Sequence, residues 1–125
     1  MKKLLLIIFF LLLPQTLFGQ SQRELPNVFF MKCEIQIFNS GKSWLFKIDR
    51  KNKTSEVKTP MVNNDFKICK EDEDQIIINR DCSENLDKFI FNKWNGSLIF
   101  IGSLEDSMSK KPCEILSINH KPLYK

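Results

Sequence analysis

The sequence has little of what enzymes most often use for nucleophilic or metal chemistry. Its one histidine, His120, lies five residues from the C-terminal end, where we expect a tail over 119–125. A serine or cysteine triad needs its histidine held rigidly beside the nucleophile, which a tail does not provide. The cysteine spacings include no CxxC, and one histidine cannot complete the usual zinc sets with them. We therefore expect no catalytic residue, no metal and no cofactor.

The acidic residues suggest two other functions, glycoside hydrolysis and calcium binding. Any two of the fifteen Asp and Glu residues could approach as the carboxylate pair of a glycoside hydrolase, although nothing singles out a pair. The run Glu71–Asp74 lacks the regular oxygen spacing and the turn glycine of a calcium loop. We interpret this run as a solvated turn that prevents edge-to-edge strand pairing. A small hydrolase that the sequence does not reveal stays an alternative.

The chain also lacks a hydrophobic run long enough to span a membrane. Lys2 and Lys3 precede the apolar segment Leu4–Leu13, which is about half the length that a membrane-spanning helix needs. The helix-breaking segment Pro14–Gly19 follows. This order predicts a secretory signal peptide over 1–19, cleaved before Gln20, with an uncleaved anchor as the alternative. We expect a periplasmic or secreted protein with no stable membrane anchoring after cleavage.

A strong charge of one sign is missing as well. Two of the 19 Lys and Arg residues lie in the predicted signal peptide, so 17 remain against 15 acidic residues, a formal charge of +2. This balance gives no reason to expect binding to nucleic acid. The roughly 106 residues left after cleavage suffice for one domain. We place it at 28–118, after a flexible lead over 20–27, and expect a monomer.

The four cysteines all follow the predicted signal peptide. An even number in an exported chain predicts two disulfides, for which three connectivities exist. Cys33 lies in the first predicted strand and Cys113 in the last, and the end strands of a closed meander are neighbours. This favours Cys33–Cys113, with Cys69–Cys82 following from it.

Apolar and polar residues alternate along much of the chain, with no helical period. In the first such run Phe29, Met31, Cys33, Ile35 and Ile37 point to one side. We expect turns at Asn63-Asn64-Asp65 and a loop over Leu104–Pro112. The pattern predicts an all-β fold, an antiparallel meander of seven or eight strands closed into a small barrel or flattened sandwich. The expected strands are Val28–Phe38, Ser43–Asp49, Glu56–Thr59, Phe66–Lys70, Gln75–Arg80, Phe89–Asn92, Leu98–Ile101 and Cys113–Ile118.

Asn95-Gly96, between two apolar runs, is a strong hairpin signal. A two-residue type I′ turn there would require positive φ at both residues and would place Phe91 opposite Phe100. A three-residue loop with a bulge would shift this register by one. In the two-residue register one face carries phenylalanine and leucine side chains, and the other carries Ile90, Trp94, Ile99 and Ile101. The first face is formed by Phe89, Phe91, Leu98 and Phe100.

Exposed tryptophan is enriched at interfaces. Trp94, beside the predicted turn, is therefore the best candidate for contact with a partner, together with Asn95. Trp44 lies inside an alternating run, so we expect it to pack in the core.

A small exported chain with cysteines in its first and last strands resembles the membrane-bound and periplasmic inhibitors of C-type lysozyme. The resemblance spans Val28–Ile118 and implies a small β-barrel whose loops insert serine and lysine into the lysozyme cleft. Ser40-Gly41-Lys42, in the first turn, is similar in composition to such an inhibitory loop. Ser40 and Lys42 are thereby implied as contacts with a cell-wall hydrolase.

These patterns predict an exported, non-catalytic binding or inhibitory module. The alternative is a carrier of a small apolar ligand, which the eight phenylalanines of the mature chain suggest. A carrier needs a cavity of a few hundred Å³ lined by phenylalanine, whereas an inhibitor does not.

Overall fold

The strands of the described residues form one antiparallel sheet. The computed structural model describes residues 24–37, 43–59 and 63–123. Over these residues nine strands occur in the order β8-β7-β6-β5-β4-β3-β2-β1-β9, so that only β9 departs from a simple meander. The strands are β1 (Val28–Glu34), β2 (Ser43–Asp49), β3 (Thr54–Lys58), β4 (Asn63–Glu71), β5 (Gln75–Asn79), β6 (Lys88–Asn92), β7 (Leu98–Ile101), β8 (Asp106–Met108) and β9 (Glu114–Leu116).

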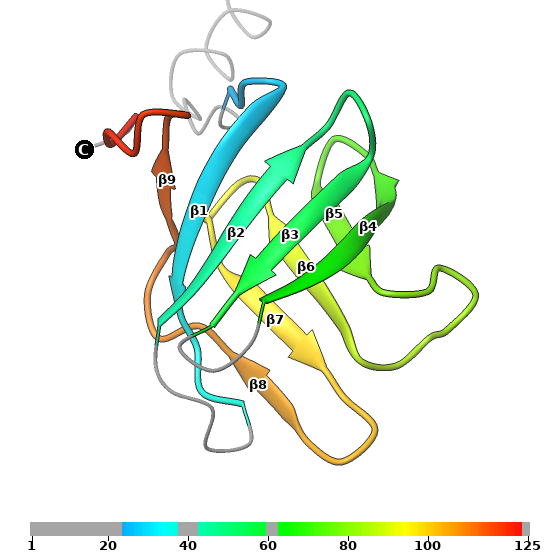
Figure 1. The fold of residues 1–125 in the computed structure, drawn as a ribbon. Helices are drawn as coiled ribbons and strands as arrows, with labels where there is room; N and C mark the ends of the chain where they lie inside the picture. Colours follow the sequence, from blue (N-terminus) through cyan, green and yellow to red (C-terminus); the bar gives the residue numbers. More distant parts are fainter. Residues whose placement is uncertain (1–23, 38–42, 60–62, 124–125) are drawn as a thin grey trace, which may run out of the picture.

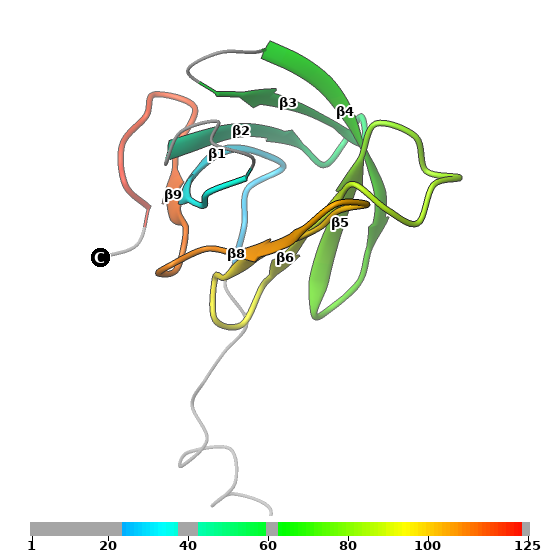
Figure 2. The same cartoon turned by 90° about the horizontal axis from the view of Figure 1, so that it is seen from below.

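The sheet curls on itself into a half barrel, which Figures 1 and 2 show from two directions. β9 pairs with β1, which brings the last strand back to the first. The segment that follows β1 approaches β8, the strand at the other edge of the sheet. There the Ser107 hydroxyl donates a hydrogen bond to the Gln36 carbonyl at 2.7 Å. The predicted all-β antiparallel fold is therefore confirmed, with β8 as an additional strand. The described residues contain no helix that could cross a membrane.

The concave face of the sheet holds the core. In β1 the side chains of Phe29, Met31 and Cys33 are fully buried, and the predicted alternation continues through Ile35 and Ile37. Bringing this apolar face out of water is the main favourable contribution to folding. The period of two in the sequence is thus explained by a sheet with one face in the core.

Both predicted disulfides are confirmed. Cys33 in β1 is bonded to Cys113, which directly precedes β9. Cys69 in β4 is bonded to Cys82, in the segment that follows β5. The pairing of β4 with β5 shifts register between Ile68 and Lys70. A β-bulge re-aims the side chain of its extra residue, and here that residue is Cys69.

Two segments predicted as turn or loop are strands. Asn63-Asn64-Asp65 was expected to turn but opens β4, where it pairs with β3. Leu104–Pro112 was expected to be a loop but contains β8, which pairs with β7. In both cases ladder hydrogen bonds to an existing neighbour outweigh the weak strand preference of polar residues.

The hairpin between β6 and β7 differs from the predicted one. Its loop is Lys93–Gly96, closed by a hydrogen bond from the Gly96 N–H to the Asn92 carbonyl at 2.9 Å. Gly96, with φ of 75°, is the only residue of this loop with positive φ. The prediction of a type I′ turn at Asn95-Gly96 is therefore wrong.

The Asn92 side chain explains the longer loop. Its Oδ1 accepts hydrogen bonds from the backbone N–H groups of Trp94 and Asn95, at 2.8 and 3.1 Å. Phe89, and not Phe91, consequently lies opposite Phe100. The slip amounts to two residues, so the side chains of β6 and β7 keep their predicted faces, whereas Trp94 lies in the loop. Phe89, Phe91, Leu98 and Phe100 share one face, as predicted, and all four are buried.

Candidate ligand cavity

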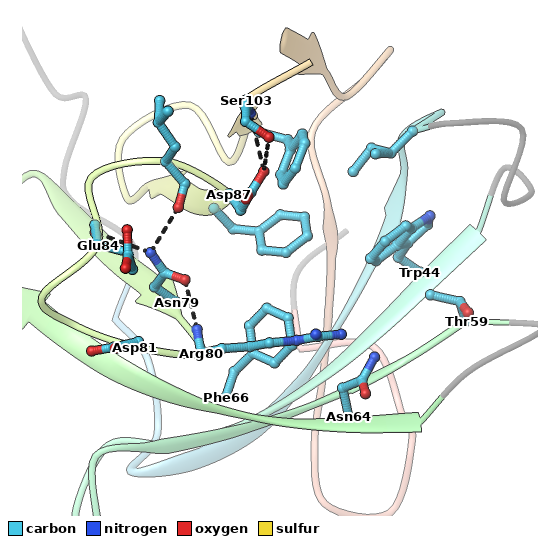
Figure 3. Close-up of a pocket in the computed structure, with 14 residues that line it drawn as sticks. Trp44, Thr59, Asn64, Phe66, Asn79, Arg80, Asp81, Glu84, Asp87 and Ser103 are labelled. Carbon is cyan, nitrogen blue, oxygen red and sulfur yellow. Dashed lines mark hydrogen bonds between the residues drawn. The ribbon is translucent and has the colours of Figure 1, made fainter. Parts of the chain in front are cut away.

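A cavity of about 590 Å³ opens at one end of the half barrel, where β5 and β7 end (Figure 3). Most of its apolar wall comes from alternating strand positions that face the concave side, and Ile37 adds to it from the segment after β1. These wall residues are Ile37, Trp44, Phe66, Phe89 and Phe100. Its charged residues all come from the segment that joins β5 to β6.

Phe89 is the centre of the aromatic wall. Its ring centroid lies 5.4 Å from that of Trp44, 5.8 Å from that of Phe66 and 5.1 Å from that of Phe100. The inclined rings pack as aromatic side chains prefer. These four side chains come from four different strands, so no short sequence motif could reveal the wall.

The segment from 79 to 87 borders the cavity and is held by its own hydrogen bonds. The buried Asn79 carboxamide donates to the carbonyls of Glu84 and Leu86, at 3.2 and 3.1 Å. The Cys69–Cys82 disulfide ties the same segment to β4. The cavity therefore has a fixed border on this side.

Three carboxylates lie on this border. Asp81 accepts hydrogen bonds from the Ser83 backbone N–H at 2.9 Å and from its hydroxyl at 2.8 Å. These bonds, the backbone one foremost, hold the pKa of Asp81 below its ordinary value. Asp87 accepts a hydrogen bond from the Ser103 backbone N–H at 3.1 Å. The third is Glu84, and all three residues are exposed.

Arg80 is the cation of the cavity. Its backbone N–H donates to the Asn79 side chain at 2.7 Å. Its guanidinium carbon lies 5.4 Å from the centre of the Phe66 ring, a cation–π contact. In Figure 3 the side chain extends across the cavity, away from Asp81 and toward the side that carries Asn64 and Trp44.

This arrangement can bind an apolar body against the rings and a polar group at the mouth. Neither His120 nor any cysteine lines the cavity. His120 instead stacks on Phe30, with 4.2 Å between ring centroids. Over the described ranges no group of three histidine, cysteine or acidic side chains could hold a metal ion.

The residues predicted to contact a partner do not meet at the cavity. Trp94 is 44% exposed, and its indole N–H donates to Asp74 at 2.8 Å. The neighbouring Asn95 uses its side chain to accept from the Ser97 backbone N–H at 2.9 Å. Both lie in the loop at the far end of β6 and β7 from the cavity. Ser40 and Lys42 lie outside the described residues, so their proposed roles stay predictions.

Sequence reasoning missed most of the cavity. Phe89 and Phe100 were expected to share one face of the hairpin, but nothing showed that they would leave a space beside them, and no orientation was predicted for Phe66. Arg80 was assigned to a strand end and was not distinguished from the other basic residues. Its significance depends on which side chains surround it.

No family model, curated protein or solved structure matches this chain. The resemblance to lysozyme inhibitors therefore has no further support, and the function has to be argued from the cavity itself.

Proposed function

We propose that this protein is an exported, non-catalytic binding protein whose cavity takes a small molecule with an apolar body. The cavity of about 590 Å³, walled by phenylalanine and tryptophan, carries this proposal. Pockets for small ligands fall in this size range and are mostly apolar, with a few polar groups at defined places. A cavity of this kind supports a carrier, because an inhibitor that works through its loops does not need one.

Export is part of the proposal. Two disulfides are consistent with an oxidising compartment outside the cytosol. The predicted signal peptide over 1–19 lies outside the described residues. Periplasmic or secreted location therefore rests on the amino-acid pattern of that segment.

The second candidate function is inhibition of another protein, such as a cell-wall hydrolase, through the β6–β7 loop. The exposure of Trp94 favours it, because large exposed aromatic rings often anchor protein interfaces. Trp94→Ala should then abolish inhibition in a screen of peptidoglycan hydrolases without affecting binding in the cavity. The two functions use opposite ends of the sheet and can be tested separately.

Tryptophan fluorescence can test whether the cavity binds a ligand. The chain has two, so the Trp94→Phe variant leaves Trp44 as the single fluorophore, in the wall of the cavity. Decanol, titrated below its solubility limit, should shift the Trp44 emission in a saturable way. Saturable binding supports the proposal, and a protein that binds neither decanol nor the ionic analogues described below contradicts it.

A matched pair of variants locates the bound molecule. Asn64 lines the cavity and its neighbour Asp65 is exposed. Asn64→Trp should fill the cavity and block binding of decanol to the protein, whereas Asp65→Trp should leave binding unchanged. Because these variants add a third fluorophore, binding is measured by calorimetry. Equal affinities of the two variants would place the ligand elsewhere.

A further inference from the structure

We propose that the ligand of the cavity is a small amphipathic anion and that Arg80 binds its carboxylate or phosphate group. This inference rests on the proposed function and adds the chemical class of the ligand. It is carried by a guanidinium that extends into an aromatic cavity and forms no ion pair with any carboxylate of the described residues.

The contrast between two arginines supports the role of Arg80. Arg50 forms an ion pair with Glu71, at 2.7 Å from its Nη2, and its Nη1 donates to the Leu25 carbonyl at 2.6 Å. Arg80 has no ion pair with any described carboxylate, and its guanidinium instead contacts the Phe66 ring. A planar guanidinium is well suited to bind a carboxylate or phosphate through two parallel hydrogen bonds. The donors of Arg80 are thus available to a ligand.

The position of Arg80 suits an amphipathic molecule. Phe89 and Phe100 are buried in the wall, whereas Arg80 is exposed. A ligand whose tail packs on these rings would therefore keep its head group near water. Asn64 lies on the side toward which the Arg80 side chain points (Figure 3), and its carboxamide could donate a further hydrogen bond.

The three carboxylates of the border do not occupy this position. Asp81 and Asp87 accept hydrogen bonds from Ser83 and Ser103, and the border residues 81–87 lie on the side of the cavity away from which Arg80 extends. Because all three acids are exposed, solvent and salt screen their repulsion of an anion. The opposite outcome, a cationic ligand bound by these acids, is tested by the same experiment.

The experiment compares molecules that share a chain length and differ in head group. Decanoate, decanol and decylamine are titrated into the Trp94→Phe protein at neutral pH, below the concentrations at which micelles form. Decanoate should bind about tenfold more tightly than decanol, because its head group gains charge-assisted hydrogen bonds at a partly hydrated site. Its affinity should fall as salt is raised, while that of decanol should not.

Variants assign the effect to Arg80. Arg80→Gln should weaken decanoate about tenfold and leave decanol unchanged, and Arg80→Lys should retain part of the affinity. Lys47→Gln is the matched control, because it removes the same charge from an exposed position of β2. It should leave both affinities as they were.

Each result has a separate meaning. Equal, saturable binding of decanoate and decanol would overturn the inference and leave the proposed cavity function intact. If decylamine binds most tightly, the inference of an anionic ligand is overturned, and the ligand is a cation bound by the carboxylates of the border. Binding of none of the three would contradict the proposed function as well. If Arg80→Gln fails to fold, the head-group comparison and the salt dependence still decide the inference.

Discussion

The ammonium group of Lys93 lies 2.7 Å from a carboxylate oxygen of Glu71, and the Lys93 side chain is only 6% exposed. The same oxygen lies 2.7 Å from Nη2 of Arg50, and Lys93 also donates to the Asp72 carbonyl at 2.6 Å. Glu71 therefore joins the β2–β3 turn, β4 and the β6–β7 loop. They meet at Glu71, the last residue of β4, at the end of the sheet opposite the cavity.

Removing the Glu71 carboxylate should destabilise the protein. Glu71→Gln would leave Lys93 buried and charged without its partner, which costs about 3 kcal/mol for a buried pair and somewhat less here, because Glu71 is partly exposed. The control is Lys70→Gln, since Lys70 and Asp72 form an exposed pair at 3.9 Å, worth at most about 0.5 kcal/mol. Urea unfolding of both variants measures the difference, and equal losses would contradict the role of Glu71.

Stability should depend on pH through the same carboxyl group. Burial opposes ionisation of Glu71, but the hydrogen bonds from Arg50 and Lys93 outweigh it and lower its pKa below the ordinary value. A lowered pKa in the folded state stabilises the protein above the unfolded pKa of about 4.3. This contribution is lost as the pH falls through the folded pKa. Unfolding measured from neutral to acidic pH should show a steeper decline for the wild type than for Glu71→Gln.

The β6–β7 loop should tolerate substitution at one of its two predicted turn residues only. Gly96 has φ of 75°, a region that β-branched side chains avoid, so Gly96→Val should destabilise the fold by roughly 1 to 3 kcal/mol. Asn95 has no positive φ, and Asn95→Ala should cost only the hydrogen bond to Ser97, about 1 kcal/mol. Chemical denaturation measures both. A larger loss of stability for Asn95→Ala than for Gly96→Val would contradict this loop conformation and favour the two-residue turn.

The Cys69–Cys82 disulfide should matter for the cavity. Replacing both cysteines by serine removes a bond that closes a loop of 13 residues, with a loss of about 3 kcal/mol in the chain-entropy model. Because the bond holds the border of the cavity, ligand affinity should fall in this variant even at temperatures where it is fully folded. Calorimetric titration checks this, and unchanged affinity would show that the border is held by Asn79 alone.

If the predicted signal peptide is cleaved, the mature protein has a defined N-terminus. The mature protein should begin at Gln20 or within about two residues of it, since signal peptidases cleave after small residues at the end of the segment. N-terminal sequencing of the periplasmic or secreted protein measures this. A product that retains Met1 would contradict the signal peptide.

Much of the fold was predictable because it depends on local alternation and on the order of the strands. The residues from Val28 to Ile37 alternate so regularly that a sheet with one face in the core was the natural solution. The same order placed Cys33 near Cys113, because the first and last strands of a curled meander are neighbours. Export and the near balance of charge were likewise inferred from the amino-acid pattern alone.

The tertiary structure decided what depends on partners in space. Asn63–Asp65 became a strand because β3 offers it a ladder, and the β6–β7 loop lengthened because Asn92 bonds to its backbone. The cavity exists because side chains from four strands line a space that they do not fill. Arg80 differs from Arg50 in that it forms no ion pair with a carboxylate of the described residues. Such contacts join residues far apart in the chain, so no local pattern encodes them.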